Sequence, residues 1–211
     1  MKLIIQIPCF NEELTLPLTV RDLPKKINGI DKIEYLIIDD GSNDNTSIVA
    51  KELGVNHIIK LRINKGLANA FKIGIEYCLK NGADIVVNTD ADNQYCGQDI
   101  EKLISPIIKH KADMVVGCRP IRRNNEFSNF KKYLQILGSW VVRKISNTMV
   151  KDVTSGFRAY SRETCLKLSL VSTFSHTLET IIQVGNSDLK ISNVDIRVNK
   201  KTRESRLFKS I

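Results

Sequence analysis

Short apolar runs alternate with amphipathic segments along the first half of the chain. The runs are rich in β-branched residues, and they are Leu3–Ile7, Ile33–Ile38, His57–Leu61, Ile85–Asn88 and Met114–Gly117. Between them, four segments carry helical signals: Asn11–Lys26, with Asn11 as its expected N-cap, Asn45–Leu53, Lys65–Lys80 and Gln98–His110. Strands separated by helices are typical of a mostly parallel sheet flanked by helices. The pattern therefore predicts an α/β fold.

The second half of the chain has a less regular pattern. A basic stretch with aromatic residues, Phe127–Met149, predicts a long helix. After it we expect an extended segment at Gly156–Tyr160, helices at Arg162–Leu168 and Thr177–Val184, and a final strand at Ile191–Val198. Because no repeat, low-complexity tract or linker divides the sequence, we predict a single domain over residues 1–211.

Composition narrows the class of protein and its possible partners. Of the 211 residues, 42% are hydrophobic and 26% are charged, which is ordinary for a folded domain with a sizeable core. The net charge of +9 favours polyanionic partners, among them nucleic acids, anionic lipid surfaces and phosphorylated substrates. The five cysteines are scattered and never spaced as C-x-x-C, which argues against a disulfide framework or a zinc site and fits a reducing cytosol. No apolar run reaches the ~20 residues that span a bilayer.

Polar clusters follow three of the predicted strands. They are Pro8-Cys9-Phe10-Asn11-Glu12, Asp39-Asp40-Gly41-Ser42 and Asp90-Ala91-Asp92-Asn93-Gln94. Ligands of open parallel sheets bind beyond the carboxyl ends of the strands. Any one cluster could be a simple turn, because Asp, Asn, Gly and Ser are common in turns. Three clusters at one edge of a sheet favour a binding site.

Asp90 and Asp92 are spaced to bind a metal ion. Two carboxylates one residue apart, directly after an apolar strand, offer hard oxygen ligands to Mg²⁺ or Mn²⁺. Gln94 could add a neutral oxygen or orient a ligand from behind. Such an ion acts as a Lewis acid on a diphosphate leaving group. The sequence has no P-loop, no G-x-G-x-x-G after the first strand and no nucleophile elbow, so acidic loops and a metal would have to hold any nucleotide.

The clusters resemble, in order, the motifs of the family-2 glycosyltransferases, which have the Rossmann-like GT-A fold. The matching segments are Ile7–Glu13, Ile37–Thr46, Asn64–Ala70 and Asp90–Asp92. The resemblance implies a nucleotide-sugar and metal-binding half at about residues 1–118. In that half it assigns nucleotide-sugar binding to Pro8, Phe10, Glu12, Asp39, Asp40, Ser42, Lys65, Asp90 and Ala91. It assigns a Mg²⁺ or Mn²⁺ ion to Asp90, Asp92 and Gln94.

Motifs in the second half are similar to those of dolichyl- and other polyprenyl-phosphate sugar synthases. They are Gly117-Cys118-Arg119, Asp152-Val153-Thr154-Ser155-Gly156-Phe157-Arg158 and Thr202-Arg203-Glu204-Ser205-Arg206-Leu207. This resemblance implies an acceptor half at about residues 119–199, followed by a basic tail at 200–211. It further implies catalytic roles for Asp92, Arg119 and Arg203, and phosphate binding by Ser155, Arg158 and Ser205. Arginine suits phosphate through its planar donor fork, although surface charge is the plainer explanation of an arginine.

Acceptor chemistry separates two versions of the reaction. A sugar hydroxyl needs a general base, which hydroxyl-glycosylating relatives supply as the Asp of a Glu-Asp pair, and here the sequence reads Glu179-Thr180. A polyprenyl monophosphate, with a second pKa of about 6, is already an anionic nucleophile at neutral pH. We therefore expect inverting, metal-dependent transfer from a UDP- or GDP-sugar to polyprenyl or dolichyl phosphate. The alternative is extension of a polysaccharide or glycan at a sugar hydroxyl.

The basic excess bears on where the protein acts. The stretch Phe127–Lys144 and the tail are expected to dock on the anionic cytoplasmic face of a membrane, unless they are simply solvated. Similar proteins often continue into membrane helices, so a membrane segment could follow the tail. A nucleic-acid partner is not expected, because its phosphates would meet the acidic clusters. A nucleotidyltransferase is disfavoured because its glycine-rich, basic first loop is absent.

Overall fold

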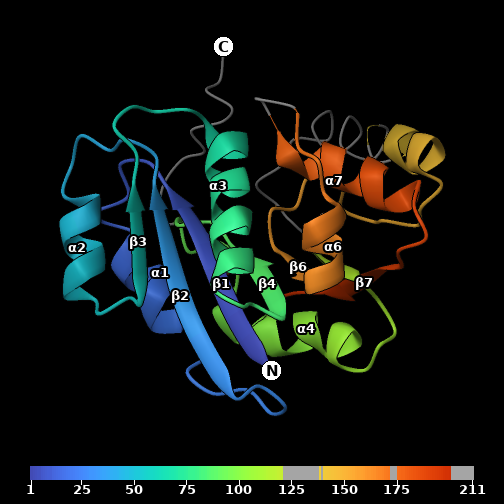
Figure 1. Ribbon diagram of the computed structural model, residues 1–211, viewed down its shortest axis with the longest axis horizontal. Helices are drawn as coiled ribbons and strands as arrows, with labels where there is room; N and C mark the ends of the chain where they lie inside the picture. The colour runs from blue at the N-terminus through green and yellow to red at the C-terminus, as the bar shows by residue number, and fades with distance from the viewer. Residues whose placement is uncertain (121–137, 139, 172–174, 201–211) are drawn as a thin grey trace.

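A computed structural model describes residues 1–120, 138, 140–171 and 175–200 (Figure 1). Its strands form one seven-stranded sheet in the order β3-β2-β1-β4-β6-β5-β7. The strands are β1 (Lys2–Cys9), β2 (Lys32–Asp39), β3 (His57–Lys60), β4 (Ile85–Asn88), β5 (Met114–Cys118), β6 (Arg158–Ser161) and β7 (Ile191–Asp195). Strand β6 runs antiparallel to β4 and β5, and the other pairs are parallel. The predicted α/β class and mostly parallel sheet are confirmed.

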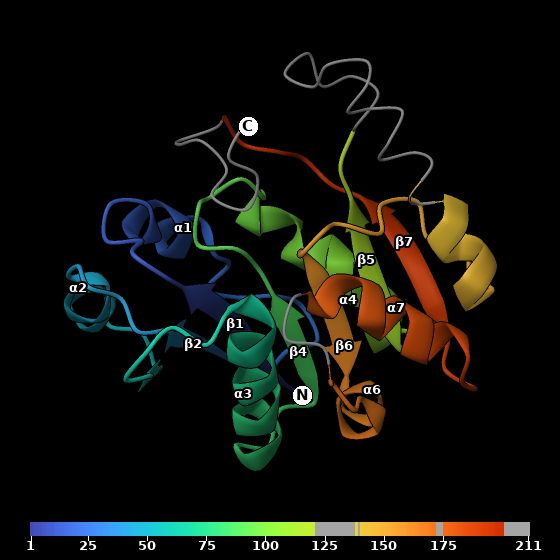
Figure 2. The same ribbon diagram turned by 90° about the horizontal axis from the view of Figure 1, so that it is seen from above.

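Helices cover both faces of the sheet. They are α1 (Leu16–Asp22), α2 (Thr46–Glu52), α3 (Leu67–Lys80), α4 (Ile100–Ile108) after the short 3₁₀ helix η1 (Gly97–Asp99), α6 (Arg162–Lys167) and α7 (His176–Gly185). Residues 140–146 are also helical. Figure 2 shows α1 and α4 on one side of the sheet and α3 and α6 on the other. None of the helices among the described residues has the length and apolarity to cross a membrane.

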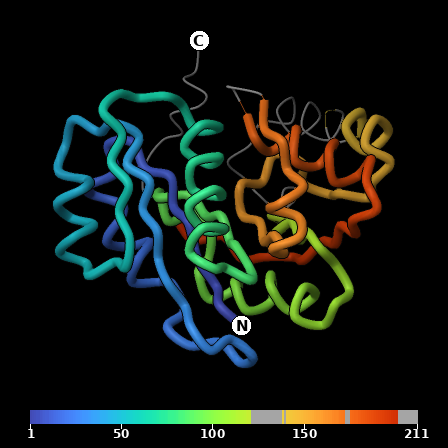
Figure 3. The backbone as a smooth tube through the Cα atoms, in the orientation of Figure 1, coloured from blue at the N-terminus to red at the C-terminus, as the bar shows by residue number. Residues whose placement is uncertain are grey.

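The core consists of two apolar layers separated by the sheet. On strand β1, Leu3, Ile5 and Ile7 pack into the layer beneath α1 and α4, whereas Ile4 packs into the layer beneath α3. Strands buried on both faces read as continuous apolar runs, which explains why the runs located the strands. Figure 3 follows the chain from its N-terminus at the edge opposite to the loops that leave β1 and β2.

Element boundaries differ from the predictions where polar side chains bind loops. The first helix begins at Leu16, with Thr15 as N-cap, so the expected cap at Asn11 is wrong. Asn11 has a left-handed backbone (φ 56°) and lies in the loop before the helix. The last strand ends at Asp195 because Val198 pairs with a different segment. Most of the predicted helix 127–149 lies outside the described residues.

Glu34 forms a charged cluster near the amino ends of the first strands. Its carboxylate accepts from Lys2 Nζ at 2.8 Å and from Lys32 Nζ at 2.7 Å, and it lies 2.8 Å from His57 Nε2. Burial alone would raise the pKa of Glu34, but the hydrogen bonds from these three partners outweigh burial and lower the pKa to about 2. The cluster therefore stabilises the fold through the ionised carboxylate.

We expect Glu34→Gln to lower the free energy of unfolding by about 2 kcal/mol at pH 7. The pKa of Glu34 in the folded protein lies below the ordinary value of 4.5 for a glutamate. The stabilisation is therefore fully present above that value and is lost as the pH falls towards the folded pKa. Urea unfolding of both proteins at several pH values measures the difference. The exposed Glu52→Gln is the control, and an equal difference at pH 3 and pH 7 would contradict the assignment.

Candidate active site

The polar clusters that follow β1, β2 and β4 lie at one edge of the sheet. These strands are adjacent and parallel, so their carboxyl ends meet on the same side (Figure 1). In the register, Cys9 lies opposite Asp39 and Gln6 lies opposite Asn88. The sheet order thus brings together segments that are about 80 residues apart in the sequence.

The loops after β1 and β2 are joined by reciprocal hydrogen bonds. Asn11 N donates to Ser42 Oγ at 2.9 Å, and Asn43 N donates to Asn11 Oδ1 at 2.9 Å. Asn45 N donates to Glu13 Oε2 at 3.0 Å. Each loop supplies side chains that satisfy backbone groups of the other, so the two loops form one unit. These contacts also explain why Asn11 is not a helix cap.

Asp39 and Asp40 are buried and hold backbone amides. Asp39 Oδ1 accepts from Ser42 N at 2.8 Å. The two oxygens of Asp40 accept from Lys65 N and Gly66 N, each at 2.8 Å. Asp40 therefore fixes the turn that starts α3, while the side chain of Lys65 is exposed. Both aspartates therefore fix the conformation of the loops that the family resemblance predicts to bind the nucleotide.

The loop after β1 borders the carboxyl-end edge of the sheet and leads into α1. Pro8 and Glu12 are buried, whereas Phe10 is half-buried. Glu12 Oε2 accepts from Thr15 Oγ1 at 2.5 Å. Ala91 is buried, and its carbonyl accepts from Thr19 Oγ1 of α1 at 2.9 Å. Helix α1 therefore supports both the loop after β1 and the loop after β4.

Asp90 and Asp92 are half-buried in the loop after β4. Burial is the main cause that raises the pKa of Asp90 to about 7. The charge of Asp92 adds to this rise, and the charge of Arg119 and a hydrogen bond with Tyr95 oppose it. Two carboxylates that repel one another at a partly desolvated edge are a suitable setting for a divalent cation, which would relieve the repulsion.

The residues present fit an ion with few protein ligands. Within the described part of the chain, no group of three or more His, Cys, Asp or Glu side chains gathers at a point. Mg²⁺ and Mn²⁺ bind through one or two carboxylates and take further ligands from phosphates and water. Gln94, the third predicted ligand, is half-buried in the same loop, and its backbone amide donates to Asp92 Oδ1 at 3.2 Å.

Arg119 is held by an ion pair at the end of β5. Its Nε and Nη2 donate to the two carboxylate oxygens of Asp152 at 2.7 and 2.9 Å, and Nη2 also donates to Thr154 Oγ1 at 2.8 Å. The Arg119 charge acts on Asp90, so the guanidinium lies close to the predicted metal loop. Asp152 and Thr154 are site residues that were not predicted from the sequence. The sequence feature that could have indicated them is the D-x-T spacing, together with an Arg that follows a neighbouring strand.

Arg158 does not fit its expected role in phosphate binding. Its side chain is fully buried. The guanidinium donates to the carbonyls of Val153, Ser155 and Thr177 at 2.8, 2.7 and 2.6 Å, and to Thr180 Oγ1 at 2.7 Å. Four of the five N–H donors are thus engaged inside the protein. Arg158 joins the Val153–Ser155 loop to α7, and a phosphate cannot reach it in this structure.

Helix α7 carries Thr180 at the position that corresponds to the Asp of a Glu-Asp pair. Thr180 is buried, and its hydroxyl donates to the His176 carbonyl at 2.8 Å while accepting from Arg158. Glu179 Oε1 accepts from Val171 N at 2.8 Å and from Gln183 Nε2 at 3.2 Å. The side chains of Thr180 and Glu179 therefore form hydrogen bonds that stabilise the surrounding structure.

Arg203 and Ser205 lie outside the described residues, but the chain that leads to them is defined. After β7, Asn199 N donates to the Gln94 carbonyl at 2.8 Å, and Cys96 N donates to the Arg197 carbonyl at 3.4 Å. Arg197 Nη2 also donates to Asp99 Oδ1 at 2.8 Å. Figure 2 shows this segment returning from β7 across the molecule. Arg197 and Asn199, which precede the basic tail, therefore lie beside the loop of Asp90 and Asp92.

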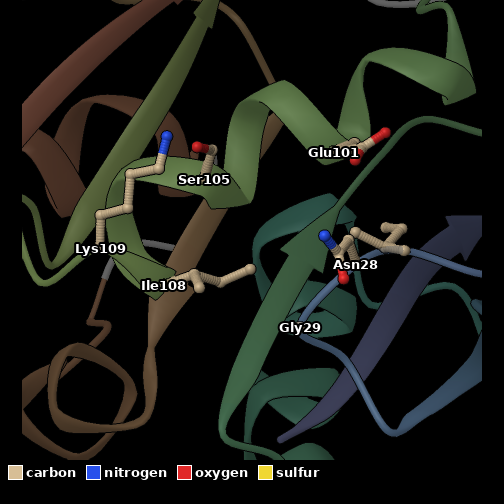
Figure 4. A pocket seen from close by; sticks show the side chains of 7 residues that line it. Asn28, Gly29, Glu101, Ser105, Ile108 and Lys109 are labelled. Carbon is tan, nitrogen blue, oxygen red and sulfur yellow. The ribbon is translucent and has the colours of Figure 1, made fainter.

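A depression of about 330 Å³ lies elsewhere, between the loop before β2 and helix α4 (Figure 4). Its lining includes Asn28, Gly29, Glu101, Ser105 and Lys109. The loop before β2 and the end of α4 lie near the amino ends of β2 and β5, opposite to the acidic clusters. The depression is therefore separate from the candidate active site.

Comparison with known proteins identifies the family of the chain. The family described as "Glycosyl transferase family 2" matches residues 4–168. The chain is 32% identical over 213 residues to the UDP-N-acetylglucosamine–dolichyl-phosphate N-acetylglucosaminyltransferase of Methanococcus voltae, a match covering 90% of this chain and 83% of that protein. It is 27% identical over 176 residues to the undecaprenyl-phosphate mannosyltransferase of Micrococcus luteus, covering 81% and 70% of the two chains.

A solved structure supports the fold independently. Glucosyl-3-phosphoglycerate synthase from Mycobacterium tuberculosis, crystallised with Mn²⁺, UDP-glucose and phosphoglyceric acid, superposes with a TM-score of 0.75 at 17% identity. The match covers 97% of this chain and 73% of that one. From the family match and the shared fold, we conclude that this chain belongs to glycosyltransferase family 2 and is a glycosyltransferase of the GT-A fold.

Proposed function

We propose that the protein transfers a sugar from a nucleotide-sugar donor to a polyprenyl or dolichyl phosphate, with inversion at the anomeric carbon. The observation that carries the proposal is the carboxylate pair of Asp90 and Asp92 beside the fixed guanidinium of Arg119. Similarity to transferases named for dolichyl and undecaprenyl phosphate supports the class of acceptor. UDP in the name of one relative makes a UDP-sugar the first donor to test, before a GDP-sugar.

Residues of the acidic edge are proposed to hold the donor. Asp90 and Asp92, with Gln94, would bind Mg²⁺ or Mn²⁺, which when bound supplies Lewis-acid stabilisation to the diphosphate. The joined loops after β1 and β2 would contact the nucleotide. Their proposed contact residues are Pro8, Phe10, Glu12, Asp39, Asp40 and Ser42, with Lys65 and Ala91 beside them.

The acceptor phosphate is proposed to bind on the side of Arg119. An oxygen of the acceptor phosphate attacks the anomeric carbon and forms a new C–O bond. The bond between that carbon and the diphosphate oxygen of the donor breaks, and its electron pair leaves with the nucleoside diphosphate. No base is required, because the phosphate is largely ionised at neutral pH. Arg119 and, from the tail, Arg203 would stabilise the leaving charge, while Ser205 would position the acceptor. The phosphate-binding role predicted for Ser155 does not fit the structure, because Ser155 is fully buried and its hydroxyl accepts from Phe157 N at 3.3 Å.

Extension of a glycan at a sugar hydroxyl remains the second candidate. That reaction needs a general base. Glu179 is engaged by Val171 N and Gln183, and Thr180 cannot serve as a carboxylate base. We therefore favour the phosphate acceptor.

We expect labelled sugar to move from UDP-N-acetylglucosamine, UDP-glucose or a GDP-sugar to undecaprenyl phosphate when Mn²⁺ is present. Chelation by EDTA should stop transfer, and added Mn²⁺ should restore it. Asp92→Ala should lower kcat/KM by about 100-fold or more, because the diphosphate loses charge stabilisation. Asp31→Ala, an exposed aspartate at the opposite edge, is the control. Undiminished transfer in EDTA would contradict the metal role, and transfer only to an oligosaccharide would contradict the acceptor.

A basic and apolar strip suggests how the enzyme meets a lipid acceptor. Around helix 140–146, Trp140, Ile145 and Met149 are 50%, 60% and 83% exposed, and Lys144 lies among them. The opposite side of the helix is buried through Val142. Figure 1 shows this helix close to α7, on the side of the molecule that carries the carboxyl ends of β1 and β2. We propose that the strip docks on the anionic cytoplasmic face of a membrane.

We expect vesicles that contain anionic lipid to bind the protein and to shift the fluorescence of Trp140, the sole tryptophan, to shorter wavelength. A Trp140→Ser/Ile145→Ser variant should bind about tenfold more weakly, because two apolar side chains no longer enter the interface. Co-sedimentation measures the affinity. Ile48→Ser/Leu166→Ser, which removes two exposed apolar side chains elsewhere, is the matched control. Equal partition of all three proteins would contradict the docking surface.

A further inference from the structure

Gly156 is the point where the predicted metal loop meets the loop before β6. Its N–H donates to Tyr95 Oη at 3.0 Å, and its carbonyl accepts from Asn88 Nδ2 at 2.9 Å. A Cβ at this position would lie 3.0 Å from Asp90 Oδ1, closer than ordinary contacts allow. Glycine therefore permits the backbone of the second half to pack directly on the Asp90 carboxylate.

Tyr95 lies behind this contact and joins its two sides. Its ring is nearly fully buried and stacks on Phe157 with the centroids 5.0 Å apart and the planes at 9°. Its hydroxyl accepts from Gly156 N–H at 3.0 Å, at the backbone that packs on the Asp90 carboxylate, and it helps to hold down the pKa of Asp90. Since the Gly156 amide is the donor in this bond, the phenol proton remains available to the neighbouring Asp90 carboxylate.

The backbone of Tyr95 is fixed from another direction. Its residue pairs with Val198 in an antiparallel bridge, and its carbonyl accepts from Asn199 Nδ2 at 3.3 Å. The ring is thus clamped by Phe157, and the main chain is clamped by the segment after β7. A hydroxyl held in this way restricts how the Asp90 carboxylate can rotate.

We propose that Tyr95 is a positioning residue that orients Asp90 for a divalent cation and couples that carboxylate to the Ser155–Arg158 loop. The inference rests on the proposed function, because it takes Asp90 as a metal ligand. Residues that hydrogen-bond a metal ligand from behind commonly change metal affinity by about 10–100-fold when they are removed. Tyr95 stands in that relation to Asp90, and its hydroxyl does so without adding charge.

Tyr95→Phe tests the inference because it removes the hydroxyl and keeps the stacked ring. We expect Mn²⁺ affinity in the presence of UDP to fall about tenfold, measured from the EPR signal of free Mn²⁺. The control is Tyr35→Phe, which removes a hydroxyl that donates to the Pro24 carbonyl at 3.1 Å. Its Mn²⁺ affinity should equal that of the wild type.

A double-variant cycle separates positioning from general destabilisation. In an Asp90→Asn background, Tyr95→Phe should change Mn²⁺ affinity by less than about twofold, because the carboxylate that the hydroxyl orients is gone. Equal Mn²⁺ affinity of wild type and Tyr95→Phe would overturn the inference alone, and so would an equal loss in both backgrounds. Wild-type protein that binds no Mn²⁺ with either UDP or GDP would overturn the proposed function together with the inference.

Discussion

The placement of four carboxylates at one sheet edge is the constraint on which the candidate site depends. Asp39, Asp40, Asp90 and Asp92 come from two loops that the strand order places together. The first two carboxylates are stabilised locally, because they accept backbone N–H groups of Ser42, Lys65 and Gly66. Asp90 and Asp92 retain a mutual repulsion that a cation would offset. An edge with this charge distribution suits a metal-bound diphosphate better than a bare anion.

Buried polar contacts connect this edge to the second half of the chain. Gln6 Nε2 donates to Asn88 Oδ1 at 3.0 Å, and Asn88 in turn donates to the Gly156 carbonyl. The motif from Asp152 to Arg158 then supplies three supports. Asp152 fixes Arg119, Gly156 packs on Asp90, and Arg158 ties the loop to α7. Much of what makes the motif recognisable is therefore the scaffold of the site.

The sequence located the sheet and the acidic edge because both depend on local patterns. Apolar runs mark strands buried on two faces, and polar residues directly after them mark the edge. Predictions were wrong where contacts with residues distant in the sequence determine the position of a side chain. Asn11 carries the signature of a helix cap, but the loop after β2 engages it. Arg158 carries the signature of a phosphate ligand, but carbonyls from two segments bury it. The role of the Tyr95 hydroxyl could not be predicted, because its hydrogen-bond partner Gly156 lies 61 residues away in the sequence.

Asp90 and Asp92 are proposed to hold a divalent ion against the donor diphosphate. Anomalous diffraction from crystals grown with Mn²⁺ and UDP tests it most directly, because the signal places the ion without reference to activity. We expect a manganese peak bonded to a carboxylate oxygen of Asp90 or Asp92 and to oxygens of the diphosphate, at about 2.1–2.2 Å, as is usual for a small hard cation with oxygen ligands. Diphosphate bound at this edge with no manganese beside either aspartate, or manganese bound only elsewhere, would contradict it.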